Sequence, residues 1–328
     1  MADNYMLDSV AAGDTPLVDF TPSGVSPAGN LLSERNPGGA PANVMAMLSK
    51  LGMRTAFIGK VGLDEFGLFL KQTLYDASVE TKGLVMAENS NTTLAFVHLK
   101  ADGDRSFRFY RNPGADLLLN KDEVDYELIG QSRWFHFGSV SMTGEPSRSA
   151  TLAAVKYAKS RGLLVSYDPN PRLSLWNSLA EARKYILDGM KYADVLKISE
   201  EELDLLMEGS DLSEGSRRIS DLYGIRMIFV TLGSRGCFYR FGQETGEIKG
   251  YQVNTIDATG ADDAFLGALL YQLMTCQTGL GQLNKAEIEA FIAFANAAGA
   301  LATTRRGAIP SLPNKSHIEA LVRGSSRT

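Results

Sequence analysis

Asp257, Asp262 and Asp263 gather in one short stretch, and they are the strongest candidates for chemistry in this chain. The stretch, 257–263, reads DATGADD and continues into an apolar run at 264–274. Small, turn-forming residues before an apolar run predict a loop that opens a helix. The first N–H groups of a helix have no intrahelical partner and, with the helix dipole, favour an anion. An anion cradle beside a carboxylate suits phosphoryl transfer to an alcohol, because the cradle offsets charge and the carboxylate takes the hydroxyl proton.

The plain alternative is that these three acids cap a helix on a solvated turn, since acids are common at helix starts. The choice depends on the other elements of the chain.

A second glycine-rich loop, 36–43, also opens a helical pattern and reads NPGGAPAN. Glycines at 38 and 39 allow the backbone to approach a ligand closely. Asn43 can offer both a donor and an acceptor to hydroxyl groups. The alternative is an ordinary connection with proline in the first helical turn. Upstream, Asp19 stands among apolar residues, either as an edge-strand acid facing water or as a ligand contact.

Strand and helix signals alternate from residue 133 onward, with strands expected at 134–140, 163–167, 195–198 and 227–231. This alternation predicts a doubly wound, mostly parallel sheet with helices on both faces. Ligands of such sheets bind beyond the carboxyl ends of the strands. Polar clusters follow several of these strand ends: 168–172 (DPNPR), 199–200 and 231–236 (TLGSRG).

Two β-rich runs, 92–99 and 106–111, read as a hairpin outside this alternation. With the segment after Phe20 they predict a small β lid, which would exclude water from a phosphoryl-transfer site. The predicted large α/β domain therefore takes residues 1–18, 37–90 and 115–328, and the lid takes 19–36 and 91–114.

Composition excludes several functional classes. The chain has 328 residues and a net charge of −5, and without a long basic run we expect no nucleic-acid partner. Its two cysteines and three histidines lack ligand-like spacing, so a metal site built on them is not expected. No apolar stretch is long enough for a bilayer span and the start lacks a signal-peptide pattern, which predicts a cytoplasmic protein without membrane contact.

Several segments match, in order, the motifs of one family: GGAPAN (38–43), GKVG with DEFG (59–67), DPNPR (168–172), KISE (197–200), TLGSRG (231–236), DATGADD (257–263), and TRRG with PSLP (304–313). The chain resembles the ribokinase-type, or PfkB, carbohydrate kinases over nearly its whole length, and among them the bacterial fructokinases. Each motif is weak alone, but their joint order and spacing are specific.

The resemblance implies phosphoryl transfer from ATP to a sugar hydroxymethyl group, most simply from fructose to fructose 6-phosphate. It assigns Asp263 as the general base, the backbone of Gly260, Ala261, Asp262 and Asp263 as the anion hole, and Arg172 to the transferring phosphate. It also implies Mg²⁺, K⁺ and a homodimer formed through the lid.

The remaining matched positions fall into three groups. Sugar contacts are expected at Asp19, Gly38, Gly39, Asn43, Asp168 and Asn170. Nucleotide contacts are expected at Lys197, Glu200, Thr231, Leu232, Gly233, Ser234, Gly236 and Asn296, with Glu200 also organising Mg²⁺ through water. A monovalent-cation site is expected at Asp257, Thr259, Ala302, Arg305, Gly307 and Ser311.

The chain departs from the family pattern at two points. The family loop normally reads Gly-Ala-Gly-Asp, whereas here Asp262 replaces the glycine beside the base. An added carboxylate about 4 Å from a phosphate would cost roughly 4 kcal/mol at an effective dielectric near 20, and solvent exposure would reduce that. Gly13 and Asp19 also stand one residue further apart than in the family. The match of Asp19 to the family's sugar-binding position is therefore less direct than that of Asp263 to the base.

Two other functions stay open. One is a sister kinase for 2-keto-3-deoxygluconate or a nucleoside, in which Arg108, Tyr110 and Arg111 receive a carboxylate; the plain alternative is that these three residues form a solvated strand. Alternatively, Asp262 makes it a kinase-like protein that binds sugar or nucleotide with little turnover.

Overall fold

The structure is a computed structural model that describes residues 6–13, 16–99 and 105–325. Its main sheet runs in the order β14-β13-β12-β11-β10-β9-β1-β4-β5, and β6 also pairs with β4. These strands are β1 (Leu7–Ala12), β4 (Thr55–Gly62), β5 (Val79–Glu80), β6 (Leu84–Ala87), β9 (Ser132–Phe137), β10 (Leu164–Tyr167), β11 (Val195–Ser199), β12 (Met227–Thr231), β13 (Gly236–Phe241) and β14 (Glu244–Lys249).

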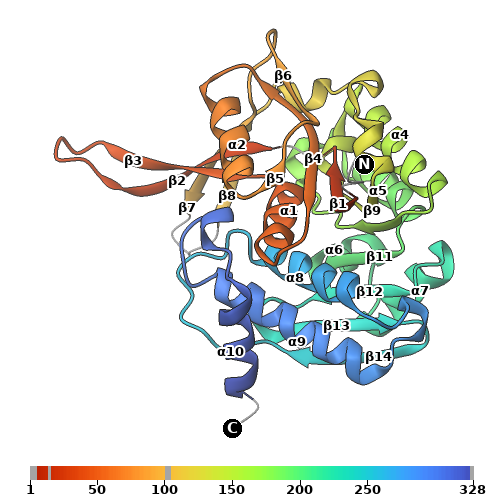
Figure 1. The fold of residues 1–328 in the computed structure, drawn as a ribbon. Helices are drawn as coiled ribbons and strands as arrows, with labels where there is room; N and C mark the ends of the chain where they lie inside the picture. Colours follow the sequence, from red (N-terminus) through yellow and green to blue (C-terminus); the bar gives the residue numbers. More distant parts are fainter. Residues whose placement is uncertain (1–5, 14–15, 100–104, 326–328) are drawn as a thin grey trace, which may run out of the picture.

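Helices cover both faces of this sheet (Figure 1). They are α1 (Ala40–Lys50), α2 (Glu65–Asp76), α3 (Tyr126–Gly130), α4 (Ser147–Ser160), α5 (Leu179–Met190), α6 (Glu200–Met207), α7 (Leu212–Tyr223), α8 (Ala261–Thr275), α9 (Lys285–Ala302) and α10 (Lys315–Ser325). Two hydrophobic clusters lie on the two faces, one built around α1, α8 and α9 and the other around α4, α5 and α7. The doubly wound fold is confirmed. Within the described residues, no helix is both long and apolar enough to span a bilayer.

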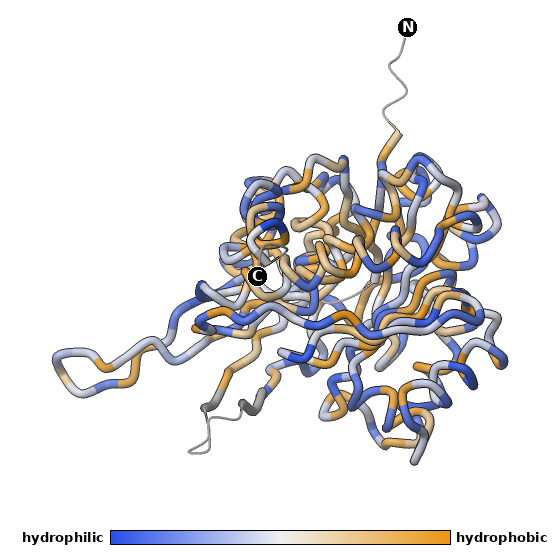
Figure 2. The backbone as a smooth tube through the Cα atoms, turned by 90° about the horizontal axis from the view of Figure 1, so that it is seen from below, coloured by the Kyte–Doolittle hydropathy of each residue, from blue (hydrophilic) through white to orange (hydrophobic). Residues whose placement is uncertain are grey.

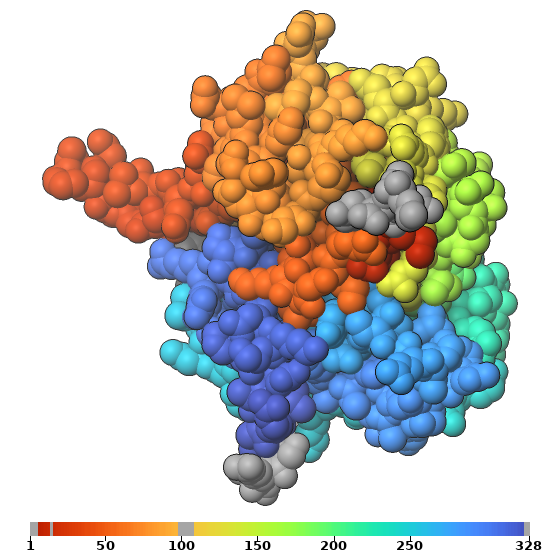
Figure 3. Space-filling view, in the orientation of Figure 1, coloured from red at the N-terminus to blue at the C-terminus, as the bar shows by residue number. Residues whose placement is uncertain are grey.

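A second sheet stands apart, in the order β3-β2-β7-β8. Its strands are β2 (Leu17–Val25), β3 (Leu31–Gly38), β7 (Leu94–Leu99) and β8 (Arg105–Tyr110). The β2–β3 hairpin projects as an arm from the body of the molecule in Figures 1, 2 and 3, and exposed apolar side chains lie near its tip, at Val25, Leu31 and Leu32. This is the predicted small β lid.

Helix α8 is apolar on nearly every side, as expected for a helix buried in a core. Packing against its neighbours therefore fixes its position. Its residues from Asp263 to Tyr271 are buried between α1 and α9. A side chain added at Gly267 would lie 2.6 Å from Cβ of Met47 on α1, so the two helices approach closely. The start of α8 is therefore fixed relative to α1.

Most predicted elements lie within a few residues of their observed bounds, with two differences. Strands β13 and β14 pair antiparallel at one edge of the sheet. Residues 140–143 form a 3₁₀ turn rather than the end of a strand.

Candidate active site

Two neighbouring cavities lie beyond the carboxyl ends of the parallel strands. The first, of about 610 Å³, is lined by the start of α8, by residues that follow β10 and β11, and by lid residues. The second, of about 440 Å³, is lined by the loop after β12 and by α9. Thr255, Ala258 and Asp262 line both cavities, so the two spaces meet beside the start of α8.

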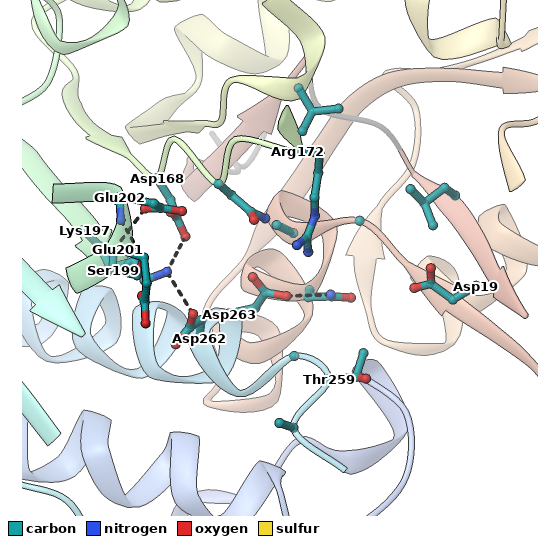
Figure 4. A pocket seen from close by; sticks show the side chains of 18 of the residues that line it. Asp19, Asp168, Arg172, Lys197, Ser199, Glu201, Glu202, Thr259, Asp262 and Asp263 are labelled. Carbon is teal, nitrogen blue, oxygen red and sulfur yellow. Dashed lines mark hydrogen bonds and ion pairs between the residues drawn. The ribbon is translucent and has the colours of Figure 1, made fainter. Parts of the chain in front are cut away.

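Asp263 lies at this start, buried and facing the first cavity (Figure 4). Its Oδ2 accepts a hydrogen bond of 2.7 Å from Nδ2 of Asn43, on α1. Burial raises the pKa of Asp263 to about 7, while the Asn43 hydrogen bond and Lys197 oppose that rise. A carboxyl group that titrates near neutral pH suits a general base.

The backbone before Asp263 is where the sequence predicts an anion cradle. Gly260 caps α8 with φ +76°, a left-handed conformation that glycine adopts without strain. The amide of Ala261 donates to the carbonyl of Ala258 at 3.3 Å. The next two amides belong to the first turn of α8 and have no carbonyl four residues earlier in the helix to receive them. They are therefore suited to hold an anion.

Lys197 stands between two carboxylates in the wall of the first cavity. Its Nζ lies 3.1 Å from Oδ2 of Asp168 and 3.4 Å from Oδ2 of Asp262. Burial lowers the pKa of Lys197, but the charges of Asp168 and Asp262 raise it by more than burial lowers it. The pKa of Lys197 therefore lies above its ordinary value. The Asp262 carboxylate therefore points to a buried ammonium group. The backbone of Asp262 is helical, and the left-handed conformation of the loop falls on Gly260 instead.

The opposite end of the first cavity contains Asp19, with Arg172 and Asp263 between Asp19 and Lys197 (Figure 4). Asp19 is half-buried on β2, and burial raises its pKa to about 6, against the influence of Arg172. A side chain at Gly38 would lie 2.4 Å from Oδ2 of Asp19, so glycine there makes room for the carboxylate. The alternative of an edge-strand acid in open water is therefore wrong.

Other predicted sugar contacts are also brought to the first cavity, which Gly39, Asn43, Asp168 and Asn170 line. Asn170 has φ +40°, an uncommon backbone conformation that asparagine tolerates better than most residues. Asn43 Oδ1 and Asp168 Oδ1 are buried without a hydrogen-bond partner within the described part of the chain. Such orphaned acceptors are costly unless a ligand or water satisfies them.

The second cavity receives most of the predicted nucleotide contacts: Thr231, Gly233, Ser234, Gly236 and Asn296. The amide group of Asn296 donates to the carbonyls of Ile248 and Lys249, at 3.0 and 3.2 Å, which ties α9 to β14. Leu232 is buried and lines neither cavity.

Glu200, expected to organise Mg²⁺, pairs with Arg235 and lines neither cavity. Its neighbours Glu201 and Glu202 line the first cavity instead. All three acids follow β11 directly, so the sequence does not show which of them faces the cavity, and the role of Glu200 at Mg²⁺ stays a prediction. Among the described residues, no three acidic, histidine or cysteine side chains converge as a metal cage. The carboxylates of Glu201 and Glu202 at the cavity are oxygen donors of the kind that Mg²⁺ takes.

The predicted cation positions are joined through Asp257. Its Oδ1 accepts from the backbone and hydroxyl of Thr259, at 2.9 and 2.7 Å, and its Oδ2 accepts from the Gly307 amide at 3.0 Å. Ala302 ends α9, Arg305 is exposed, and the Ser311 hydroxyl donates to the Ala308 carbonyl. The 257–259 and 302–311 segments are thus tied together, as a site built from their carbonyls requires.

Arg111 has a structural role that the amino-acid sequence did not indicate. It forms a buried ion pair with Asp116, and its Nη1 donates to the hydroxyl of Thr143 at 2.8 Å. Asp116 also accepts from Thr93 at 2.5 Å. Arg111 therefore anchors the base of the lid to the body, and the expectation that it receives a substrate carboxylate is wrong.

Comparisons with known proteins agree with this geometry. A family model for pfkB family carbohydrate kinases matches residues 24–315. Fructokinase-1 of Zea mays is 46% identical over 310 residues, covering 93% of this chain and 95% of that protein. Fructokinase-2 of Oryza sativa subsp. japonica is 43% identical, covering 93% of this chain and 91% of that protein.

Solved structures share the fold. The fructokinase of Xylella fastidiosa with bound ATP superposes with a TM-score of 0.88 at 32% identity, covering 97% of this chain and 99% of that one. A fructokinase double mutant of Vibrio cholerae O395, in a form with fructose, ADP and potassium ion bound, gives a TM-score of 0.86 at 36% identity with the same coverage. This chain belongs to the pfkB family of carbohydrate kinases.

Proposed function

We propose that this carbohydrate kinase transfers the terminal phosphoryl group of ATP to the hydroxymethyl group of fructose, giving fructose 6-phosphate. The observation that carries the proposal is the position of Asp263. Its carboxyl group is buried at the start of α8, where the two cavities meet, and it titrates near neutral pH. A sugar in the first cavity and a nucleotide in the second would bring their reacting groups together there.

In this mechanism the sugar hydroxyl oxygen attacks the terminal phosphorus while its proton passes to Asp263. The bond from that phosphorus to the bridging oxygen breaks, and ADP leaves. The amides of Asp262 and Asp263 at the start of α8, with Arg172 and Lys197 on the cavity wall, would balance the charge of the transferring group. Mg²⁺, held near Glu201 and Glu202, would neutralise phosphate charge.

At the sugar end, Asp19 and Asn43 would bind hydroxyl groups, because a carboxylate accepts hydrogen bonds and a side-chain amide both donates and accepts. Fructose is favoured as the substrate because the relatives named above are fructokinases. The buried pairing of Arg111 with Asp116 weakens the 2-keto-3-deoxygluconate alternative, because it occupies one of the cations to which that alternative assigned the substrate carboxylate.

Three further features belong to the proposal. K⁺ would bind between the 257–259 and 302–311 segments. The lid, residues 19–36 and 91–114, would close over the sugar and pair with a second copy through its projecting β2–β3 hairpin. The cytoplasmic location stays a prediction.

The test is phosphorylation of fructose, 2-keto-3-deoxygluconate and a nucleoside by ATP, each measured with and without potassium. We expect fructose to give the highest kcat/KM and potassium to raise it. Asp263→Asn should lose roughly 100- to 10,000-fold in kcat, the range of a general base, while fructose binding by calorimetry persists. Absence of fructose turnover, or full activity in Asp263→Asn, would refute the proposal.

A further inference from the structure

The two partners of Lys197 are held very differently. Lys197 and Asp168 have side chains only 3% exposed, and the distance between them is 3.1 Å. Asp262 is 57% exposed and lies 3.4 Å from the same ammonium group. Taking Asp168 away from Lys197 would leave a carboxylate buried and unpaired, at high cost. Taking Asp262 away leaves a carboxylate that water can hydrate at once, so its bond to Lys197 is the weaker of the two.

The position of Asp262 adds a second observation. It lines both cavities, whereas Lys197 and Asp168 line only the first of the two. The buried Oδ1 of Asp168, which lines the same wall, has no hydrogen-bond partner in the described part of the chain. Because Asp262 lines both cavities and pairs with Lys197, an anion in the second cavity that extends toward Lys197 would compete with this exposed carboxylate; Figure 4 shows the Asp262–Lys197 pair.

We infer that Asp262 is an exchangeable counter-ion of Lys197, which the terminal phosphate of the nucleotide displaces on binding. This inference rests on the proposed function and specifies how its nucleotide site selects ligands. Asp168 keeps Lys197 in place, and Asp262 occupies its remaining side until a phosphate arrives. The residue therefore lowers nucleotide affinity in proportion to the negative charge brought to the junction, and it favours release of ADP after transfer.

The expected signature follows from charge. A nucleoside carries no phosphate to the junction, so its affinity is independent of Asp262. ADP carries less charge there than ATP, and ATP without magnesium carries the most. Removing the carboxylate should therefore tighten ATP binding most, ADP binding less and adenosine binding not at all. Screening by salt should shrink the difference.

The experiment is calorimetry of adenosine, ADP and ATP, without magnesium, on the wild-type protein and on Asp262→Asn, at low and at 0.5 M potassium chloride. We expect Asp262→Asn to bind ATP roughly five- to thirtyfold more tightly, which corresponds to about 1–2 kcal/mol. The gain for ADP should be smaller, and Asp262→Glu, which keeps the charge, should resemble the wild type.

Asp221→Asn is the matched control, since it removes the same charge from an exposed pair with Arg217 on α7, outside both cavities. A gain that is equal for the three ligands, or no gain for ATP, overturns the inference while leaving the kinase assignment intact. Failure of ATP to bind any of these proteins overturns both. Loss of ATP affinity in Asp262→Asn would make Asp262 a phosphate-site ligand instead of a competitor.

Discussion

Asp263 and Asn43 are joined by a 2.7 Å hydrogen bond although 220 positions separate them in the chain. The bond links the first turn of α8 to the first turn of α1, and both residues are buried. It therefore holds the carboxyl group of Asp263 in place and lowers its pKa, against burial that raises it to about 7. Three predictions depend on this balance, and two more concern the loop and the lid.

The rate of fructose phosphorylation should follow the ionisation of Asp263. We expect kcat/KM to rise with pH and to level off above an apparent pKa near 7, because only the carboxylate form can accept the hydroxyl proton. Below pH 6, protonation of Asp19 should raise KM as well. A pH profile of initial rates checks both effects. A profile that is flat between pH 5 and 8 would contradict them.

Asn43→Ala should move this profile to higher pH. The hydrogen bond from Asn43 stabilises the charged carboxylate, so its loss leaves burial less opposed and raises the pKa of Asp263 further. The measurement is the apparent pKa of kcat at saturating fructose, which separates this effect from weaker sugar binding. Asn43→Asp is a useful second variant, because a second carboxylate there should raise the pKa of Asp263 still more.

Asp263→Asn should be more stable than the wild-type protein at neutral pH. The raised pKa means that the folded state disfavours the carboxylate, so its stability falls as pH rises from about 4 to about 7 and is constant above that. The asparagine variant has no ionising group at this position, so it does not lose stability in this way as the pH rises. The gap in unfolding free energy between the two proteins should therefore widen by roughly 2–3 kcal/mol from pH 5 to pH 8. Urea titrations at both values test it, and a constant gap would contradict it.

Gly260→Ala should impair both folding and turnover. Alanine at φ +76° is strained, and its Cβ would lie 2.9 Å from Ala308, so we expect a loss of about 2–3 kcal/mol in stability. Gly224 is a matched control, because it has φ +72° with open space around the added atom. Gly224→Ala should cost about 1 kcal/mol and leave kcat unchanged, so equal effects at the two sites would count against the tight fit of the loop.

The ion pair at the base of the lid should contribute much more to stability than one on the surface. Arg111 and Asp116 have side chains 3% exposed, and Asp116→Asn should cost about 3–5 kcal/mol, because it leaves a buried guanidinium without its counter-ion. Asp188→Asn, in an exposed pair with Lys191, should cost less than about 1 kcal/mol. Thermal unfolding of both variants measures the difference, and similar losses would show that the lid base does not depend on this pair.

The sequence by itself determined the alternating strands and helices, the glycine-rich loops and the assignment of Asp263 to a helix start. These features are local, because hydrophobic periodicity and capping residues act over a few positions. The place of Arg172 at the cavity also followed from the sequence, since it comes after a strand of the parallel sheet and the carboxyl ends of such strands meet at one edge. The places of Gly260 and Asp19 followed from the family resemblance.

Only the tertiary structure decided which charges meet. The turn of α6 directs Glu200 to Arg235 and leaves Glu201 and Glu202 at the cavity. The side chain of Arg111 pairs with buried Asp116, and Asp262 at the start of α8 pairs with Lys197 on β11. Such pairings depend on the distance between charges on segments far apart in sequence and on how deeply those charges are buried. The energy of a charge pair changes strongly with both. Residue types and spacing alone therefore leave them open.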